Sequence, residues 1–286
     1  MLLGAHQSIE GGFDRAPLRG RETGCTSLQI FVKSSSQWRA RPITSEETEA
    51  FQNNCRASRI AAIVAHSSYL INLGARDQAL WRRSIEACAD ELRRCAALGI
   101  PGLILHPGAH KGAGEEEGLK RIAGGLDQVL EDARDLRVQI ILEATAGQGT
   151  VLGYRFEHLA RLFELVQRNE RLGVCLDTCH LFAAGYDLRT EKGYERAMES
   201  FDQIVGFQHL KVLHLNDSKK PLGSRVDRHE HIGKGFLGLQ AFRLIMQDDR
   251  MKGLPMILET PKEPDPVKND RRNLTTLKRL GRRHRP

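Results

Sequence analysis

The sequence predicts a single (β/α)8 TIM barrel, and three observations support this fold class. Eight short apolar or β-branched segments of strand character recur along the 286 residues. Amphipathic segments of helical length separate most of them, and alternation of this kind is typical of a closed sheet of parallel strands. No Pro- or Ser-rich linker divides the chain, so we expect one barrel domain over residues 1–270 and a basic C-terminal tail, 271–286, that includes the end of the last helix.

The individual elements follow from apolar periodicity. Runs such as IAAIVAH, VQIILE and PMILE are too short for helices and are bounded by polar segments, which favours strands. Strands are predicted at residues 2–6, 28–32, 60–66, 102–106, 138–143, 173–177, 212–216 and 255–259. Between them, apolar residues three to five positions apart, such as Ile85, Ala89 and Leu92, share one helical face. Helices are predicted at 10–21, 76–98, 115–136, 156–167, 194–207, 237–246 and 267–280, with glycines interrupting the first.

Composition restricts the class of protein. No run of 18 apolar residues and no charged-then-apolar leader is present, so we expect a protein without a membrane partner that stays in the cytoplasm. The six cysteines are scattered, which favours reduced, buried thiols over disulfides. Seven of the 43 basic residues lie in 271–286 with no acidic one, whereas 1–270 holds 36 of each sign. Such a tail favours a polyanionic partner, although solvated basic ends are also common.

Metal-ligand residue types close six of the predicted strands. The residues are His66, His106, Glu143, Asp177, His214 and Glu259, at intervals of 34 to 45 positions. Parallel strands of a barrel end on one face, so these side chains are expected to converge at one mouth. Residues two positions earlier, such as Ile141 below Glu143, share the same side of the strand and would fill the barrel interior. The alternative is that these are only structural polar residues at strand ends.

Three further candidates extend this set beyond what one tetrahedral ion can use. His180 follows Asp177 by three residues, and Asp227 and His229 lie in the loop after the seventh strand. Imidazole and carboxylate together suit zinc and other borderline metals, so a multinuclear site is predicted. Two or three divalent ions bridged by a carboxylate suit hydrolysis of a phosphodiester.

Long motifs resemble one known family. They are GAHQS (4–8), HSSYLINL (66–73), HPGAH (106–110), LEATAGQG (142–149), GVCLDTCHLFAAGYDLRT (173–190), HLNDSKKPLGSRVDRH (214–229) and ILET (257–260). In these segments the chain resembles the endonuclease IV family of apurinic/apyrimidinic endonucleases. The resemblance implies a barrel with three zinc ions, which cuts double-stranded DNA 5′ to an abasic site and leaves a 3′-hydroxyl and a 5′-deoxyribose phosphate. Manganese stays an alternative at one position, and a monomer associated with the nucleoid through DNA is expected.

The resemblance also implies a role for each candidate. His66, His106 and Glu143 would hold the first ion; Glu143, Asp177, His214 and Glu259 the second; and His180, Asp227 and His229 the third. Glu143 would bridge two ions and act as the catalytic carboxylate. Tyr69 and Leu70 would enter the duplex, and Trp38 and Arg39 would contact backbone or sugar.

Two positions depart from the family pattern. Ser36 stands where many members carry an arginine that enters the duplex, and Lys234 stands where an acidic residue is usual. Neither position is a proposed ligand. Two other functions stay open from the sequence: a sugar isomerase or epimerase with one or two ions at the same mouth, and a non-catalytic protein that binds damaged DNA and holds zinc structurally.

Overall fold

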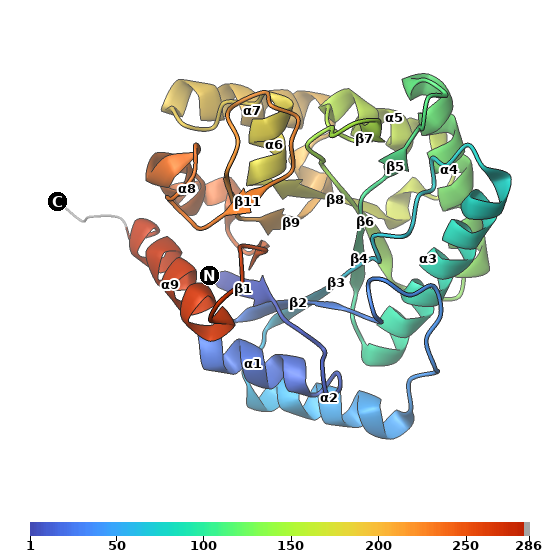
Figure 1. The fold of residues 1–286 in the computed structure, drawn as a ribbon, viewed down its shortest axis with the longest axis horizontal. Coiled ribbons are helices and arrows are strands. Elements are labelled where there is room, and N and C mark those ends of the chain that lie inside the picture. The colour runs from blue at the N-terminus through green and yellow to red at the C-terminus, as the bar shows by residue number, and fades with distance from the viewer. Residues whose placement is uncertain (283–286) are drawn as a thin grey trace.

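Eight parallel strands close into a barrel with helices around it (Figure 1), as the alternating pattern predicts. The computed structural model describes residues 1–282. Around the barrel the strands are β1 (Leu2–His6), β2 (Ser27–Phe31), β3 (Ala62–His66), β4 (Gly102–Leu105), β6 (Gln139–Glu143), β8 (Leu172–Asp177), β9 (Leu210–His214) and β12 (Pro255–Leu258), and β12 pairs again with β1. Each falls within two residues of its predicted start and end, so all eight strand predictions are confirmed.

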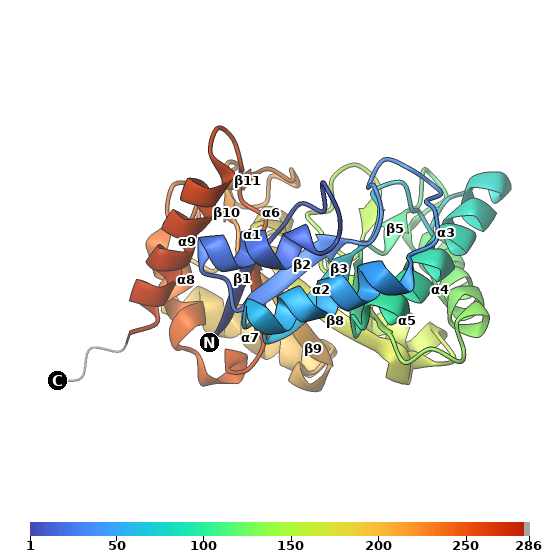
Figure 2. The ribbon, with the colours of Figure 1, turned by 90° about the horizontal axis from the view of Figure 1, so that it is seen from below.

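Helices cover the outside of the barrel (Figure 2). They are α1 (Arg15–Thr23), α2 (Ser45–Ala57), α3 (Gln78–Leu98), α4 (Glu115–Asp132), α5 (Phe156–Leu165), α6 (Thr178–Ala184), α7 (Glu191–Ile204), α8 (Gly238–Gln247) and α9 (Pro266–Leu280). Local signals fix several ends: the Asp77 side chain accepts from the backbone N–H of Leu80 to start α3, and left-handed Gly99 closes it. None of the described helices has the length and apolar character needed to cross a membrane.

Three helices differ most from the sequence-based prediction. Helix α6 was not predicted, because it directly follows β8 and nearly all of its seven residues are buried, so it has no one-sided apolar pattern. The first helix of the chain starts at Arg15 and not at residue 10, because Gly11 and Gly12 have φ of 81° and 125° and cannot be helical. Helix α2 was not predicted, because Phe51 and Cys55 are its only buried residues and its apolar periodicity is weak. Its capping box, in which Thr44 and Glu47 satisfy each other's backbone N–H groups, was the available signal.

Two short antiparallel strand pairs lie above the mouth and were also not predicted. One pairs β5 (Gly108–Ala109) with β7 (Val151–Leu152), and the other pairs β10 (Asp217–Ser218) with β11 (His229–Glu230). Strands of two residues carry no measurable periodicity, so only the folded chain reveals them. The β10–β11 pair is a hairpin, and it places the segment that contains Asp227 and His229 beside the strand ends.

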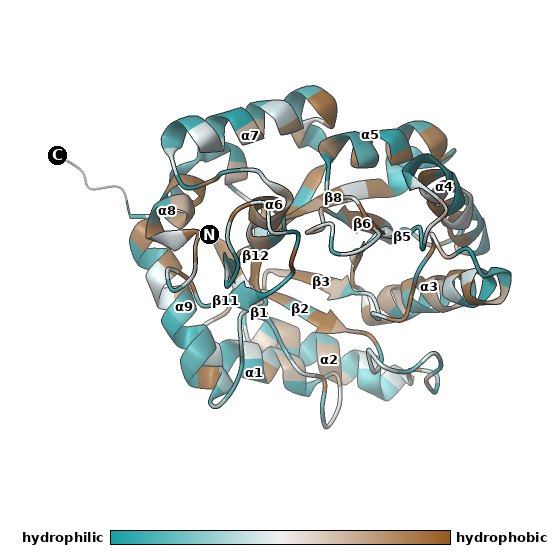
Figure 3. Cartoon of the chain, turned by 45° about the horizontal axis from the view of Figure 1, so that its top comes forward, coloured by the Kyte–Doolittle hydropathy of each residue, from teal (hydrophilic) through white to brown (hydrophobic). Residues whose placement is uncertain are grey.

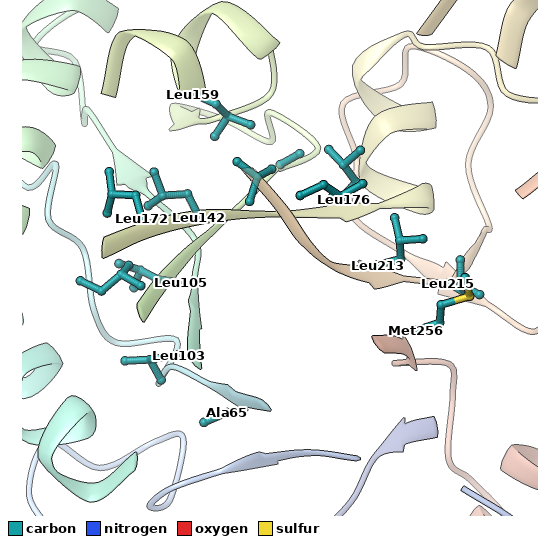
Figure 4. Packing of buried hydrophobic residues seen from close by; sticks show 14 of the residues in the cluster. Ala65, Leu103, Leu105, Leu142, Leu159, Leu172, Leu176, Leu213, Leu215 and Met256 are labelled. Atoms are coloured by element: carbon teal, nitrogen blue, oxygen red, sulfur yellow. The ribbon is translucent and has the colours of Figure 1, made fainter. Parts of the chain in front are cut away.

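The apolar core has two parts. A layer inside the barrel consists of Val64, Ile104, Ile141, Cys175, Val212 and Ile257, one from each of six strands and each two positions before a predicted ligand. A larger cluster lies between the strands and the helices, where Leu105, Leu142 and Leu176 point outward from the sheet (Figure 4). The strands are accordingly mostly brown in Figure 3, whereas the helices carry both apolar and polar stripes. This packing holds the strand ends in fixed positions.

The basic C-terminal stretch is mostly helical. Leu274, Leu277 and Leu280 bury one face of α9, so residues up to 280 belong to the barrel and not to a free tail. Since α9 runs back from the mouth, its last turn lies at the opposite end of the barrel, where Lys278 donates to the carbonyl of Gly24 just before β2. The part of the predicted tail at residues 283–286 lies outside the described residues.

Candidate metal centre

The strand-end candidates meet at one mouth of the barrel. His66, Glu143, Asp177 and His214 are the last residues of β3, β6, β8 and β9, while His106 and Glu259 directly follow β4 and β12. The first four are buried and the last two are partly exposed. Parallel register explains this convergence, because it aligns the carboxyl ends of all eight strands.

The Glu143 carboxylate lies at the centre of the group. Its Oε2 is 3.1 Å from Nε2 of His66 and 3.1 Å from Nε2 of His106. Its Oε1 is 3.0 Å from Nδ1 of His214 and 3.3 Å from Nδ1 of His180. The side chain is completely buried. Two oxygens that each face two imidazoles form a bridge between two sets of donors.

A second group of donors surrounds His214. Its Nδ1 is 3.3 Å from Oε2 of Glu259 and 3.8 Å from Oδ2 of Asp177. Asn216 holds both carboxylates in place: its Nδ2 donates to Oδ2 of Asp177 at 2.6 Å, and its Oδ1 accepts from the backbone N–H of Glu259 at 2.8 Å. Asn216 is itself fully buried. The three strand ends are therefore cross-linked through one amide.

The third group comes from α6 and the β10–β11 hairpin. Asp177 caps α6 by accepting from the backbone N–H of His180, which places that imidazole over the mouth. Asp227 lies 3.1 Å from Nε2 of His180 and 3.2 Å from Nε2 of His229 through its two oxygens. The side chain of Gln148 accepts the backbone N–H of Asp227 at 3.0 Å and fixes the loop. This contact joins residues far apart in sequence.

The donor set fits divalent cations. Ligand atoms lie within 4.8 Å of one another in three groups: His66, His106 and Glu143; Glu143, Asp177, His214 and Glu259; and His180, Asp227 and His229. Zinc is bound in proteins by histidine nitrogens and carboxylate oxygens such as these. Four carboxylates gathered in a largely buried space also require positive charge nearby. The structure brings together the same residues that the sequence resemblance groups, and their roles as ligands stay a prediction.

The ionisation of these side chains reflects their mutual contact. Burial opposes the charged form of Glu143, but His214 and His106 outweigh it and hold the pKa of Glu143 well below its usual value. Burial likewise opposes the charged form of His229, yet Asp177 and Asp227 raise its pKa to about 9. In the absence of metal, protons on the histidines therefore balance the carboxylates, and cations would compete with these protons.

The thiols beside the site are protonated. Cys175 lies near Glu143 and His214, and Cys179 lies near Asp177 and His229. Burial is the main cause that raises the pKa of each thiol to about 12. Cys175 also belongs to the apolar layer inside the barrel. All six cysteines are buried and free, as expected from their scatter.

Sequence reasoning missed Gln29, which touches the centre, as do His6 and Asn216. Gln29 on β2 contacts both His214 and Glu259 with its side-chain amide. It lies on the interior side of β2, where most other strands carry apolar residues, and it is fully buried. A polar side chain that faces the barrel interior needs a hydrogen-bond partner there. The polar residue at an interior-facing position of β2 was therefore the signal that could have identified Gln29.

The predicted duplex-entering residues lie beside the mouth. Tyr69 is 69% exposed, and its ring centroid is 5.9 Å from that of His66. The loop is anchored below by Glu91, which accepts the backbone N–H of Ser68 and forms a buried ion pair with Lys33 at 3.2 Å. The ring is therefore exposed beside the mouth on a loop that is held in place from below. Leu70, the next residue, is partly exposed.

Trp38 and Arg39 lie further from the centre. They line a groove of about 860 Å³ with residues of α3, and the guanidinium of Arg83 stacks over the Trp38 ring at 4.5 Å. They make no contact with the donor groups described above. The two departures from the family pattern, Ser36 and Lys234, are both exposed.

This chain is similar to a known protein family in sequence and in structure. A family model described as a xylose isomerase-like TIM barrel matches residues 19–280. A protein from Chloroflexus aurantiacus named probable endonuclease 4 is 53% identical to this chain, over 97% of each of the two chains. A protein of the same name from Geobacter sulfurreducens is 47% identical, over 98% of this chain and 95% of its own length. The crystal structure of endonuclease IV from Thermus thermophilus superposes with a TM-score of 0.87 at 37% identity, covering 98% of both chains.

A D-tagatose 3-epimerase-like protein also superposes, with a TM-score of 0.73 over 98% of both chains. Its identity is 17%, so it shares the fold alone. The extensive identity to proteins named endonuclease 4 separates this chain from the epimerases. The chain belongs to the endonuclease IV family of apurinic/apyrimidinic endonucleases.

Proposed function

We propose that this protein hydrolyses the phosphodiester 5′ to abasic sites in double-stranded DNA and leaves a 3′-hydroxyl and a 5′-deoxyribose phosphate. The observation that carries the proposal is the grouping of nine donor side chains into three sets, two of which share Glu143. Three sets of this kind suit three divalent ions, and their imidazole and carboxylate donors favour zinc. The names of the similar proteins supply the nuclease class.

Each donor set would hold one ion. His66, His106 and Glu143 would bind the first; Glu143, Asp177, His214 and Glu259 the second; and His180, Asp227 and His229 the third. When bound, the ions would activate water and neutralise negative charge on the phosphate and on the departing oxygen. Manganese at one position is compatible with the same donors.

The chain's own residues would orient the reacting groups and accept a proton. Glu143, fixed on β6, would accept the proton of the attacking water through a carboxylate oxygen. Water would attack phosphorus, the bond from phosphorus to the 3′-oxygen would break, and the departing oxygen would take up a proton to become the 3′-hydroxyl while the phosphate stays on the deoxyribose side. Because the donors sit at the ends of packed strands, their positions are set before substrate arrives, and little reorganisation is needed during the reaction.

Basic residues beside the third donor set would attract the DNA backbone. Five exposed basic residues lie on the segment that connects β10 and β11 and on its continuation: Lys219, Lys220, Arg225, Arg228 and Lys234. Their positive charge lies next to the mouth, which favours docking of a polyanion there. Lys234, one of the departures from the family pattern, adds to this surface.

Abasic sites would be selected by local deformation of the duplex. A nucleotide without a base has less stacking to lose, so moving it into the mouth requires less free energy than moving an intact nucleotide. The exposed ring of Tyr69 and the neighbouring Leu70 would fill the space left in the duplex. Trp38 and Arg39 would contact the flanking strand.

Incubation of metal-quantified protein with an end-labelled abasic duplex tests this function. We expect one incision product with a 3′-hydroxyl, three zinc ions per chain, and loss of activity after treatment with a strong chelator. An intact duplex of the same sequence is the control. Tight binding without product would indicate a damage-binding protein, and turnover of a ketose without incision would indicate an epimerase.

A further inference from the structure

The side-chain amide of Gln29 uses every one of its hydrogen-bonding groups on residues of the mouth. Its Oε1 is 2.7 Å from Nε2 of His214. Its Nε2 is 2.5 Å from Oε1 of Glu259 and 2.9 Å from Nδ1 of His6. One residue of β2 thereby contacts side chains carried by β1, β9 and the end of β12.

The orientation of this amide follows from its partners. The carboxylate of Glu259 can only accept, so the NH2 group must face it. The amide oxygen then faces His214, and since that oxygen has no proton to give, Nε2 of His214 must carry one. Both N–H groups and the oxygen of Gln29 have hydrogen-bond partners, and the side chain is fully buried. Turning the amide over would lose these hydrogen bonds, so only one orientation is favourable.

This arrangement decides which nitrogen of His214 is available to a cation. In the neutral imidazole that a cation binds, a proton on Nε2 leaves the lone pair on Nδ1, which faces Oε1 of Glu143 at 3.0 Å and Oε2 of Glu259 at 3.3 Å. Nδ1 is therefore the nitrogen directed at the carboxylates. The same amide restrains Glu259 through its other oxygen.

We propose that Gln29 is a positioning residue for the metal centre: it fixes the tautomer of His214 and the orientation of Glu259. The inference rests on the proposed ligand roles of those two residues. Groups that hold the outer nitrogen of a ligand histidine typically contribute about 10- to 100-fold to metal affinity. Here one amide serves an imidazole and a carboxylate of the same set.

The test compares zinc affinity, by competition with a chromogenic chelator, in Gln29→Leu, Gln29→Met and the unchanged protein. Gln7→Leu is the matched control, because Gln7 is also a buried glutamine but donates to Asp270, outside the donor groups. We expect about 10- to 100-fold weaker zinc binding in both Gln29 variants and near-normal binding in Gln7→Leu. Thermal unfolding checks that each variant is folded.

A spectroscopic measurement separates positioning from general stabilisation. In zinc-loaded protein with 15N-labelled histidine, His214 should show a protonated Nε2 whose hydrogen exchanges slowly with water, and this signal should exchange faster in Gln29→Leu. Unchanged zinc affinity, equal loss in Gln7→Leu, or an unprotonated Nε2 in the unchanged protein would overturn the proposal. The last measurement decides the question even where neither Gln29 variant folds.

A parallel incision assay on the unchanged protein distinguishes the two proposals. Absence of incision together with weakened zinc binding in the Gln29 variants would reject the proposed function and leave the positioning role standing. Normal incision by the unchanged protein together with unaffected zinc binding in the Gln29 variants would reject the positioning role and leave the proposed function standing.

Discussion

Oε1 of Glu143 lies 3.0 Å from Nδ1 of His214, although 71 residues separate them in the chain. Both side chains are fully buried. A carboxylate and an imidazole at this distance inside a barrel are costly unless each is neutralised by its partner or by a cation. The pair therefore marks the centre of the site.

Replacing Glu143 by glutamine should remove incision while retaining DNA binding. The amide preserves size but loses the charge that would bridge two ions and the base that would accept a proton. We expect the rate to fall by about 10²- to 10⁴-fold or more, measured in single-turnover assays, with duplex affinity near normal. The exposed carboxylate of Glu117 on α4 supplies the control, Glu117→Gln, whose rate should not change. Retained turnover in Glu143→Gln would exclude it from the chemistry.

Metal affinity should increase with pH between about 6.5 and 9. His229 has a pKa of about 9 in the metal-free protein, because Asp177 and Asp227 outweigh the effect of burial. Below that pH the imidazole carries a proton that a cation must displace, so binding releases at least one proton and strengthens as pH rises. Calorimetry in buffers of different ionisation enthalpy measures the release. His229→Gln should release fewer protons, and a pH-independent affinity would contradict the assignment.

Changing Tyr69 and Leu70 together to alanine should reduce discrimination between abasic and intact duplexes. Tyr69 is 69% exposed, so its loss removes little packing from the folded protein. We expect the preference to fall by about 10-fold or more, as loss of a stacking side chain worth roughly 1–3 kcal/mol implies. Metal content per chain serves as the control measurement. Equal losses of metal and of discrimination would instead indicate a folding defect.

The basic residues of α9 should differ in their effect on DNA binding. Arg272 lies on the mouth side, close enough to contribute, after burial, to the lowered pKa of His231. Arg279 lies near the far end of the helix, in the turn where Lys278 contacts Gly24. Arg272→Gln should lower the salt dependence of binding by about 0.9 in log–log slope, whereas Arg279→Gln should leave it unchanged. Equal effects would show that DNA also reaches the opposite end of the barrel.

The buried ion pair under the Tyr69 loop should contribute to stability. Lys33 and Glu91 are each about 1% exposed at the side chain and lie 3.2 Å apart. Removing one partner leaves an unpaired buried charge, so Lys33→Met should lower the free energy of unfolding by about 3–5 kcal/mol, measured by urea denaturation. The double change Lys33→Met with Glu91→Leu should recover part of this loss. Full additivity of the two single changes would argue against a direct interaction.

The chain itself determined the barrel and the six strand-end donors. Alternation of apolar segments fixed the fold class, and the period of two placed Ile141 and Glu143 on the same side of one strand, as the structure confirms. These properties are local, since each depends only on residues a few positions apart. Parallel pairing then brings all strand ends to one face without further information.

Tertiary structure decided what local patterns do not encode. The contact of Gln29 with His214 spans 185 residues, and that of Gln148 with Asp227 spans 79. The position of the basic end of α9 away from the mouth likewise depends on the direction in which the helix packs. The Gln29 amide and the backbone of Asp227 find their partners only when distant segments fold together. Hydrogen-bond partners depend on proximity in space and not on spacing in sequence.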